Sequence, residues 1–453
     1  MIDLLLDQAR RSPAAAFLET PDRSLTYAAA AAEARRLGVA LRRRNLGRVA
    51  LHCHDSPELV LLLAGCAAAG CEPCVVDRGT PPAETAALLH RLGLGTVVTD
   101  ADGSFSAADV LRLGDVVAEA RKLPEPVDEI AVAPRLLLLT TGTTGPPKAA
   151  VYTWASLAAQ VRQRTALAGT RWLLAYHLNH FAGLQVLLHV VANAATLVIP
   201  RSGRVADALA AIVARRVEHV SGTPTFWRFL LAELGTRDAA ALPLRQITLG
   251  GEAVPQDLLQ SLHRTFPAAR ISQVFATTEA GSCFSVRDLE AGLPAELVER
   301  PAADGVELRV VDGVLQVRSR HGMLGYAGEA EQDPAAWRST GDVVARRGDR
   351  YVFLGRTTDT INVGGAKVHP AAVEEVVQRV PGVIAVRCQG RPNPVTGQIV
   401  AIDVLPAEPS GTAALETRIR SACEALPPPA RPRLIRFVES IDTANGKLMR
   451  RTP

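Results

Sequence analysis

Aromatic residues and long apolar runs are both scarce in this 453-residue chain. Phe, Tyr and Trp make up 4% of it, and the longest apolar stretches, 59–69 and 184–192, are far shorter than the roughly 20 residues that a membrane-spanning helix needs. The formal net charge of +4 is too small over this length to indicate nucleic-acid binding. The segment 1–17 carries Asp7, Arg10 and Arg11, which do not fit a secretory signal. We therefore expect a cytoplasmic protein with no membrane and no nucleic-acid partner.

The seven cysteines are odd in number and scattered. Cys71 and Cys74 have C-x-x-C spacing, and Cys53, Cys66 and His52 lie near them in the sequence, which leaves a zinc site open. No second such pair exists, and these cysteines fall in an apolar strand–helix–strand pattern, where free Cys behaves as a small hydrophobe. Burial without a metal is therefore the favoured interpretation.

The most distinctive stretch runs from Leu136 to Ala150, LLLLTTGTTGPPKAA. Its apolar start predicts a buried strand over 136–139, because a short apolar run bounded by turn residues is typical of a strand covered on both faces. The glycines and prolines stop that strand, and the threonine hydroxyls, backbone N–H groups and Lys148 can together wrap a phosphate. The spacing is not that of a Walker A loop. On local chemistry alone, a flexible connection is the alternative.

Helix-like and strand-like segments alternate through the chain as far as residue 275. Helices are predicted at 25–45, 56–70, 81–92, 154–167, 183–192, 206–216, 224–234 and 255–265. Strands are predicted at 48–52, 74–77, 96–99, 136–139, 171–176, 196–199, 219–222, 246–250 and 271–275. The alternation predicts doubly wound α/β subdomains. Residues 102–130 are polar and weakly patterned, so we expect a plain connection there.

From Val306 the pattern becomes rich in strands. Segments 307–311 and 314–318 flank Asp312–Gly313, a strong two-residue hairpin signal, and segments 342–345 and 351–354 predict a second hairpin. Beyond 355–359, helices at 370–379 and 413–425 and strands at 385–389 and 399–405 form an α+β pattern of ordinary domain size. We therefore predict an α/β protein with a large domain over 1–355, which includes a β-rich subdomain, and a small α+β domain over 356–453.

The segment TTGTTGPPK resembles the phosphate loop of the adenylate-forming superfamily: acyl- and aryl-CoA ligases, nonribosomal peptide adenylation domains and luciferases. The runs LTYAAAAAEARRLGVALRRR and SPELVLLLAGCAAAGCEPCVVD resemble the opening of the same family. The resemblance implies that the loop binds the phosphates of ATP. The loop residues concerned are Thr140, Thr141, Gly142, Thr143, Thr144, Gly145 and Lys148.

The segment QVFATTEAG, at 273–281, resembles the family's Y-G-x-T-E motif. The resemblance implies that Glu279 holds Mg²⁺, a hard ion that prefers oxygen ligands, and that Thr278 bonds a phosphate oxygen. Phe275 replaces the tyrosine and keeps an aromatic face for adenine. The alternative for Glu279 is an acid at a helix N-terminus. Further residues assigned to the nucleotide are Ala276, Thr277, Gly250, Gly251 and Glu252.

The segment STGDV, at 339–343, resembles the family's T-G-D motif, and a Gly-Arg pair follows at 355–356. The resemblance implies that Asp342 accepts hydrogen bonds from both ribose hydroxyls and that Arg356 reaches the ribose or the phosphates. A turn aspartate and a surface ion pair are the alternatives. The family's hinge position holds Thr358, with Asp359 next, where Asp or Lys is usual, so the pivot residue stays open.

Two C-terminal motifs complete the resemblance: INVGGAKVHP, at 361–370, and ANGKLMRR, at 444–451. The first implies that Gly364, Gly365 and Lys367 meet the thiol acceptor after the small, mobile domain has rotated. The second implies that Lys447 bridges the substrate carboxylate and the α-phosphate, a form of electrostatic help whose loss commonly costs on the order of 10²–10³ in rate. A solvated basic tail is the alternative for Lys447.

The segment YHLNHFAGL, at 176–184, takes the place of the family's L-P-x-x-H-x-x-G segment. His180 matches the histidine and is assigned to the acyl pocket or the thiol tunnel, with a buried structural histidine as the alternative. The residues expected to make this pocket polar are His177, Asn179 and Gln185. A further wall is expected from Phe226 and Trp227. GPPKAAVYTWASL resembles the o-succinylbenzoate–CoA ligase branch, so we expect an aromatic or compact acid.

The resemblance as a whole implies an AMP-forming acid–thiol ligase. A carboxylate would attack ATP, with Mg²⁺ as cofactor, to give acyl-AMP and pyrophosphate, and the acyl group would then pass to a thiol, expected to be that of CoA. The alternative acceptor is the phosphopantetheine of an acyl carrier protein, and a third is an amine or other nucleophile. A function of a different class is also an alternative, namely that of a non-catalytic nucleotide-binding relative. The presence of Lys447 and Glu279 argues against it.

Overall fold

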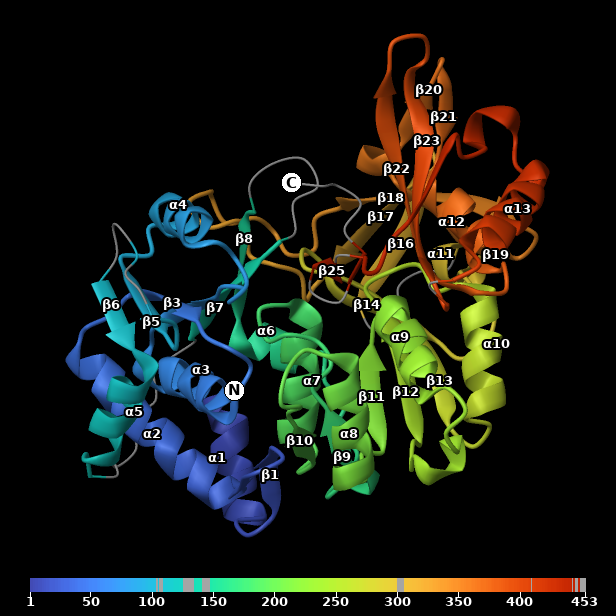
Figure 1. Cartoon of the computed structure of the whole chain (residues 1–453). Helices are drawn as coiled ribbons and strands as arrows, with labels where there is room; N and C mark the ends of the chain where they lie inside the picture. The colour runs from blue at the N-terminus through green and yellow to red at the C-terminus, as the bar shows by residue number, and fades with distance from the viewer. Residues whose placement is uncertain are drawn as a thin grey trace.

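Two parallel sheets lie side by side in the lower part of the molecule, and the C-terminal domain lies at the upper right of Figure 1. This computed structural model describes residues 1–102, 105, 109–124, 134–140, 147–299, 305–408, 410–441, 443–444 and 447–448. Among the helices in these ranges, none is long and apolar enough to cross a bilayer.

The six-stranded sheet has the order β6-β5-β3-β4-β7-β8, and its strands are parallel except for the β7–β8 hairpin. Its strands are β3 (Arg48–His52), β4 (Glu72–Val75), β5 (Thr96–Thr99), β6 (Asp109–Arg112), β7 (Arg135–Leu139) and β8 (Ala149–Thr153). Its helices are α2 (Tyr27–Arg43), α3 (Pro57–Ala69), α4 (Pro82–Leu92) and α5 (Leu113–Arg121). Helix α3 begins as predicted: the Ser56 hydroxyl accepts a hydrogen bond from Leu59 N at 3.2 Å, and Pro57 takes the first position.

The expectation of a plain connection over 102–130 is wrong. Strand β6 forms an edge of the six-stranded sheet, and α5 packs against α2. The pattern is weak because α5 buries only a narrow stripe, Leu113, Val116 and Ala120, at spacings of three and four residues. The helix expected over 154–167 is also shorter, since α6 covers only Trp154–Ala158.

The eight-stranded sheet has the order β14-β13-β12-β11-β9-β10-β1-β2, antiparallel only at its two outermost pairs. Its strands are β1 (Ala16–Glu19), β2 (Ser24–Thr26), β9 (Arg171–Leu173), β10 (Thr196–Val198), β11 (His219–Gly222), β12 (Gln246–Gly250), β13 (Arg270–Thr277) and β14 (Gly281–Val286). Its helices are α1 (Ile2–Arg11), α6, η1 (Thr165–Leu167), α7 (Phe181–Ala192), α8 (Val205–Arg215), α9 (Pro224–Leu234), η2 (Ala239–Ala241) and α10 (Gln256–Thr265). Parallel strands end at one edge, so the loops after β9, β12 and β13 lie together.

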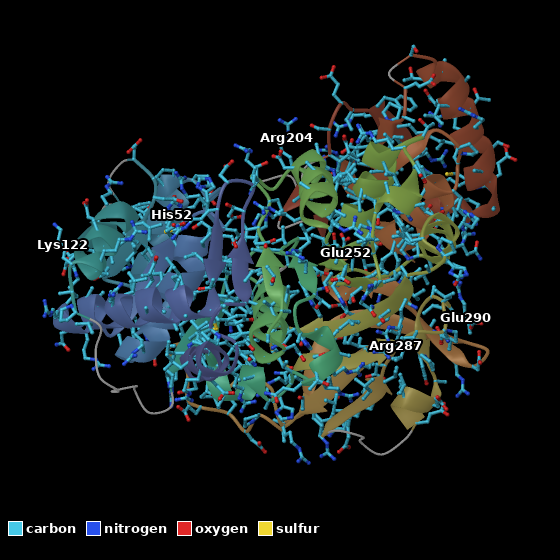
Figure 2. All side chains as sticks on the ribbon, turned by 90° about the horizontal axis from the view of Figure 1, so that it is seen from below. His52, Lys122, Arg204, Glu252, Arg287 and Glu290 are labelled. Carbon is cyan, nitrogen blue, oxygen red and sulfur yellow. The ribbon has the colours of Figure 1, made fainter. Side chains whose placement is uncertain are left out.

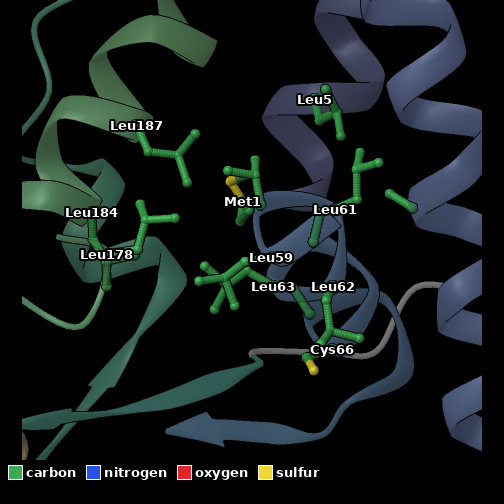
Figure 3. Close-up of a cluster of buried hydrophobic side chains, with 14 of the residues drawn as sticks. Met1, Leu5, Leu59, Leu61, Leu62, Leu63, Cys66, Leu178, Leu184 and Leu187 are labelled. Carbon is green, nitrogen blue, oxygen red and sulfur yellow. The ribbon is translucent and has the colours of Figure 1, made fainter. Parts of the chain in front are cut away.

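The largest hydrophobic core joins the two parallel sheets. Leu59 and Leu63 of α3 lie opposite Leu184 and Leu187 of α7, with Met1 beside them (Figure 3). Nearly all of α3 is buried, which explains why its sequence is apolar around the whole helix rather than along one stripe. The two sheets therefore share one core and form a continuous base beneath the candidate site.

The β-rich layer is a five-stranded antiparallel sheet with the order β15-β19-β18-β17-β16. Its elements are β15 (Leu293–Pro294), α11 (Glu296–Glu299), β16 (Val306–Val311), β17 (Val314–Ser319), β18 (Arg338–Arg347) and β19 (Arg350–Arg356). Asp312 and Gly313 have φ angles of 51° and 75°, the left-handed pair that a type I′ hairpin turn requires. Both predicted hairpins are confirmed.

The C-terminal part has a hydrophobic core of its own, drawn from residues 361–437. Its elements are η3 (Thr357–Asp359), β20 (Ile361–Val363), β21 (Ala366–Val368), α12 (Pro370–Gln378), β22 (Val383–Asn393), β23 (Gly397–Pro406), α13 (Thr412–Ala422), η4 (Cys423–Ala425), η5 (Pro428–Ala430) and β24 (Leu434–Phe437). The terminal pair β25 (Thr443–Ala444) and β26 (Lys447–Leu448) lies apart from this sheet, and β26 lies against α9 of the large domain (Figure 1). The predicted α/β class, with its β-rich part and small α+β part, is confirmed.

Candidate active site

The predicted phosphate loop is held between two antiparallel strands. Thr140, just after β7, is joined to Lys148, just before β8, by a backbone hydrogen bond of 2.8 Å from Thr140 N to Lys148 O. Five predicted loop residues lie outside the described residues: Thr141, Gly142, Thr143, Thr144 and Gly145. The hairpin that carries the loop therefore has a fixed base, and Lys148 lies at that base.

Lys148 has two neighbours from a segment distant in sequence. Its Nζ is 3.1 Å from Glu329 Oε1 and lies over the ring of Tyr326, 4.6 Å from the centroid. The Lys148 side chain is 58% exposed, so its charge is open to an incoming anion. The position suits an ammonium that pairs with phosphate.

Glu279 follows β13 and is held by a second contact from the same tyrosine. The Tyr326 hydroxyl donates to Glu279 Oε1 at 3.2 Å, and the Tyr152 hydroxyl of β8 donates to Thr278 O at 2.8 Å. Burial, and next the Glu279 carboxylate, raise the pKa of both tyrosines, so each phenol keeps its proton. The structure thus brings Lys148, Thr278 and Glu279 together through two tyrosines.

Sequence patterns did not point to Tyr152 or Tyr326 as site residues. Their hydroxyls act on residues of another motif, which no local spacing reveals. The only signal was indirect: Tyr152 lies two residues before Trp154 in a stretch already noted for its resemblance, and Tyr326 lies between Gly325 and Ala327 in a small-residue turn.

The donor set around Glu279 fits Mg²⁺ bound to a nucleotide. Oε1 accepts the Tyr326 hydrogen bond, while Oε2 accepts none from the described part of the chain. Among those residues, no group of three or more His, Cys, Asp or Glu side chains forms a metal cage. A single carboxylate suits Mg²⁺, which usually takes one or two protein carboxylates and completes its shell with substrate phosphates and water.

The Cys66, Cys71 and Cys74 thiols are buried, which raises their pKa and keeps them protonated.

Phe275 belongs to a group of three near-parallel rings. Its ring centroid lies 5.1 Å from that of Phe284 and 5.4 Å from that of Phe353, with interplanar angles of 11° and 24°. These contacts join β13 and β14 to β19 of the β-rich sheet. Thr277 uses its hydroxyl locally, accepting a hydrogen bond from Ala280 N at 3.0 Å. The contacts of Phe275, Ala276 and Thr277 with adenine stay predictions.

The segment Gly250–Glu252 ends β12 in a tightly packed turn. The Tyr176 hydroxyl donates to Gly250 O at 2.9 Å, and Gly251 has a φ of 83°. Glu252 Oε2 accepts from Thr225 N at 3.0 Å, in the first turn of α9, near the centre of the molecule in Figure 2. Glu252 thus stabilises the helix beside which β26 lies.

Asp342 and Arg356 face each other across β18 and β19. They are register partners, and Arg356 Nε is 3.4 Å from Asp342 Oδ1. Burial raises the pKa of the neighbouring Cys283 thiol to about 12, and the Asp342 carboxylate adds to the rise. The structure therefore pairs the two residues predicted to hold the ribose and places them near the strand after Glu279.

Some of the residues predicted for the acyl pocket lie in the hydrophobic core instead. His180 is the N-cap residue of α7, and the His177 side chain is half-exposed. Gln185 is buried, and its Nε2 donates to Leu157 O at 3.1 Å, so its amide N–H group is used within the core. Trp227 is fully buried in the core under the sheet, and its Nε1 donates to Thr248 O, so the wall predicted from it is wrong.

A cross-sheet ion pair that the sequence did not suggest fixes His177. Its Nδ1 is 2.6 Å from Asp55 Oδ2, and Asp55 Oδ1 accepts from Leu178 N at 3.1 Å. Asp55 follows β3 of the six-stranded sheet, whereas His177 follows β9 of the eight-stranded sheet. The hydrogen bond and charge of Asp55 raise the pKa of His177. The pair joins the segments that follow the two sheets.

The C-terminal residues fall at two ends of the small domain. Gly364 and Gly365, with φ of 58° and 88°, form the turn between β20 and β21, and Lys367 lies on β21, far from the phosphate-loop hairpin (Figure 1). Lys447, by contrast, lies on β26 beside α9, although its side chain lies outside the described residues. This arrangement presents the Lys447 strand, rather than the glycine turn, to the large domain.

Comparison with known proteins matches both parts of the chain. Residues 5–329 match the family model described as AMP-binding enzyme, and residues 372–447 match the AMP-binding enzyme C-terminal domain. The medium/long-chain-fatty-acid–[acyl-carrier-protein] ligase of Mycobacterium tuberculosis (strain CDC 1551 / Oshkosh) is 25% identical over 514 residues, covering 99% of this chain and 94% of that protein. Feruloyl-CoA synthase of an Amycolatopsis species is 29% identical over 451 residues, covering 89% and 88%.

The fold also matches that of o-succinylbenzoate CoA synthetase from Bacillus subtilis, solved in complex with its acyl-adenylate intermediate. The TM-score is 0.77 at 21% identity, covering 99% of this chain and 96% of that one. The likeness to aryl- and o-succinylbenzoate-type ligases that the motifs indicated is confirmed. Because the first family model spans well over half of its length, the chain belongs to the AMP-binding enzyme family.

Proposed function

We propose that this chain activates a carboxylic acid with ATP, releases pyrophosphate, and passes the acyl group from acyl-AMP to the thiol of CoA. The observation that carries the proposal is the placement of Lys148 and Glu279, from two separate motifs, on either side of Tyr326. An ammonium and a carboxylate so placed suit a triphosphate and its divalent ion, since the ammonium pairs with phosphate oxygens and the carboxylate ligates the metal.

The residues act in the first half-reaction by holding and orienting charged groups. The loop 140–148 would bind the phosphates, and Asp342 and Arg356 the ribose. Lys447 would lie between the substrate carboxylate and the α-phosphate, lowering their repulsion as the new P–O bond forms and pyrophosphate leaves. Mg²⁺ held at Glu279 would supply charge neutralisation on the phosphates.

We propose a domain boundary at 355/356, between β19 and η3, and a rotation about it between the two half-reactions. Support comes from the separate hydrophobic cluster of residues 361–437. After adenylation, rotation about η3 would withdraw Lys447 and bring Gly364, Gly365 and Lys367 to the site for the thiol. Because ATP and CoA are abundant in the cytoplasm, we propose that location.

An aromatic or compact acid is the substrate class that we propose. Support comes from the names of two matched proteins, which pair CoA with feruloyl and o-succinylbenzoate groups. Half-exposed, polar His177, in the segment expected to form the acyl pocket, suits such an acid better than an alkyl chain. The second candidate acceptor is an acyl carrier protein, which one matched ligase names together with a fatty acid.

The test is pyrophosphate release with ATP and Mg²⁺ against pooled carboxylic acids, with mass detection of acyl-AMP, with and without CoA. Acid-dependent release, with a thioester appearing only when CoA is present, is the expected result. Acyl-AMP without a CoA thioester would move the acceptor to a carrier protein. Nucleotide binding without release from any acid would contradict the ligase function.

A matched pair of variants ties that activity to the site. Glu279→Gln should abolish most of the release, because the neutral amide is a poor Mg²⁺ ligand. Asp115→Asn, at an exposed acid in the first turn of α5 at the lower left of Figure 1, removes the same charge away from the phosphate-loop hairpin and should leave the rate unchanged.

A further inference from the structure

The segment that carries Tyr326 is fixed against the phosphate-loop hairpin by its backbone. Val151 N donates to Gly325 O at 2.9 Å, Leu324 N donates to Val151 O at 2.9 Å, and Ala327 N donates to Ala149 O at 2.8 Å. Tyr326 itself forms an isolated antiparallel bridge with Ala150. Its side chain is therefore aimed by β8, the strand that follows Lys148.

Arg338 holds the same segment from the other side. Its guanidinium donates to Met323 O at 3.4 Å, to Asp333 O at 3.1 Å and to Pro334 O at 2.7 Å. Met323 N in turn donates to Glu279 O at 2.9 Å. The backbone on both sides of the Tyr326–Glu279 contact is thus pinned, so the contact does not depend on a free loop.

The two ends of the Tyr326 side chain serve different partners. The ring face lies under the Lys148 ammonium, and the hydroxyl donates to Glu279 Oε1. A phenylalanine would keep the first contact and lose the second.

We propose that Tyr326 is a positioning residue for Mg²⁺–ATP: its hydroxyl fixes the Glu279 carboxylate through Oε1 and leaves Oε2 for the metal, while its ring places Lys148 for the phosphates. The inference rests on the proposed function, since it assigns these two residues to the nucleotide. It predicts that a change at Tyr326 alone can weaken the Mg²⁺-dependent part of ATP binding and leave the Mg²⁺-independent part unchanged.

The experiment measures ATP affinity by calorimetry and by the ATP-induced rise in Tm, once with Mg²⁺ and once with EDTA. Tyr326→Phe should weaken Mg²⁺–ATP binding about tenfold, the usual effect of losing a hydrogen bond to a charged group. Binding in EDTA should stay unchanged, because the ring remains under Lys148. Tyr326→Leu, which lacks the ring as well, should weaken binding under both conditions.

Tyr351→Phe is the control, since Tyr351 is a partly buried tyrosine on β19 that packs at the edge of a different hydrophobic cluster. It should leave both affinities at the wild-type value. Equal loss in Mg²⁺ and in EDTA for Tyr326→Phe would indicate a merely structural role and overturn the inference. So would an unchanged Mg²⁺–ATP affinity. If the wild type itself fails to bind ATP, the proposed function falls first, and this inference falls with it.

Discussion

At the scale of single residues, the most informative contacts join motifs that lie far apart in the chain. Asp55 and His177 come from different sheets, yet their side chains lie 2.6 Å apart. His177 stands where the family usually has proline, so the sequence marked the position as unusual without naming its partner. The structure supplies that partner and gives the histidine a raised pKa.

This pair predicts a pH-dependent contribution to stability. The pKa of His177 is higher in the folded chain than its unfolded value near 6.5. Its stabilisation is therefore fully present below about pH 6.5 and is lost as the pH rises through the folded pKa. Because the His177 side chain is 48% exposed, the contribution should be about 1 kcal/mol or less.

Urea unfolding of the wild type and of Asp55→Asn at pH 6 and pH 9 measures this effect. The asparagine can still accept from Leu178 N, so the difference in free energy of unfolding isolates the charge. We expect that difference to be larger at pH 6 than at pH 9. The same difference at both pH values would contradict the pair's role. Asp115→Asn, at an exposed acid of α5, controls for the loss of a carboxylate.

At the scale of elements, the start of α7 positions His180 and depends on one glycine. A Cβ at Gly183 would lie 2.2 Å from His177 O and 3.0 Å from Tyr176 O. The first turn of α7 thus passes directly against the segment that carries His177. No other residue fits without moving that segment.

Gly183→Ala should therefore lower the free energy of unfolding by about 1–3 kcal/mol, as overpacking commonly does, and should reduce adenylation. Gly114→Ala in the first turn of α5 is the matched control, because a Cβ there meets nothing within 4 Å. It should leave stability unchanged or raise it by up to about 1 kcal/mol, since alanine favours helix. Equal stabilities of the two variants in chemical denaturation would show that the close approach at Gly183 is unimportant.

Element prediction succeeded where the local signal was strong. Ser56 and Pro57 start α3, and Asp312–Gly313 turns the β16–β17 hairpin, because caps and turns follow from a few adjacent residues. It failed for β6 and α5, where a short edge strand and a narrow buried stripe left little pattern. Burial of so few side chains depends on the neighbouring helix α2, which local periodicity does not show.

At the scale of the whole molecule, the position of the C-terminal domain sets which half-reaction the chain is arranged for. Strand β26, with Lys447, lies against α9, while the Gly364–Gly365 turn lies at the far end of the small domain (Figure 1). In the first turn of α9, Thr225 N donates to Glu252 Oε2. This is the arrangement that we propose for the adenylation step.

Lys447→Ala should lower acyl-AMP formation by a factor on the order of 10²–10³, because the variant lacks the ammonium between two anions. Thioester formation from supplied acyl-AMP should be spared, since we propose that this step uses the Gly364–Gly365 turn at the other end of the small domain. Single-turnover assays of the two half-reactions give the comparison. Lys122→Ala, at the outer edge of the large domain in Figure 2, is the control. Adenylation that survives intact in Lys447→Ala would contradict the role assigned to the C-terminal domain.

The sequence by itself determined the layered α/β fold and indicated the enzyme family. Strand and helix periodicity are local properties of the sequence. The family motifs are also short segments, so they identify the phosphate loop, Glu279, Asp342 and Lys447 without a structure. Only the tertiary structure decided which side chains meet. Tyr326 joins Lys148 to Glu279, and Trp227 and Gln185 are used in the core, because burial and hydrogen bonding are settled by packing between segments far apart in the chain.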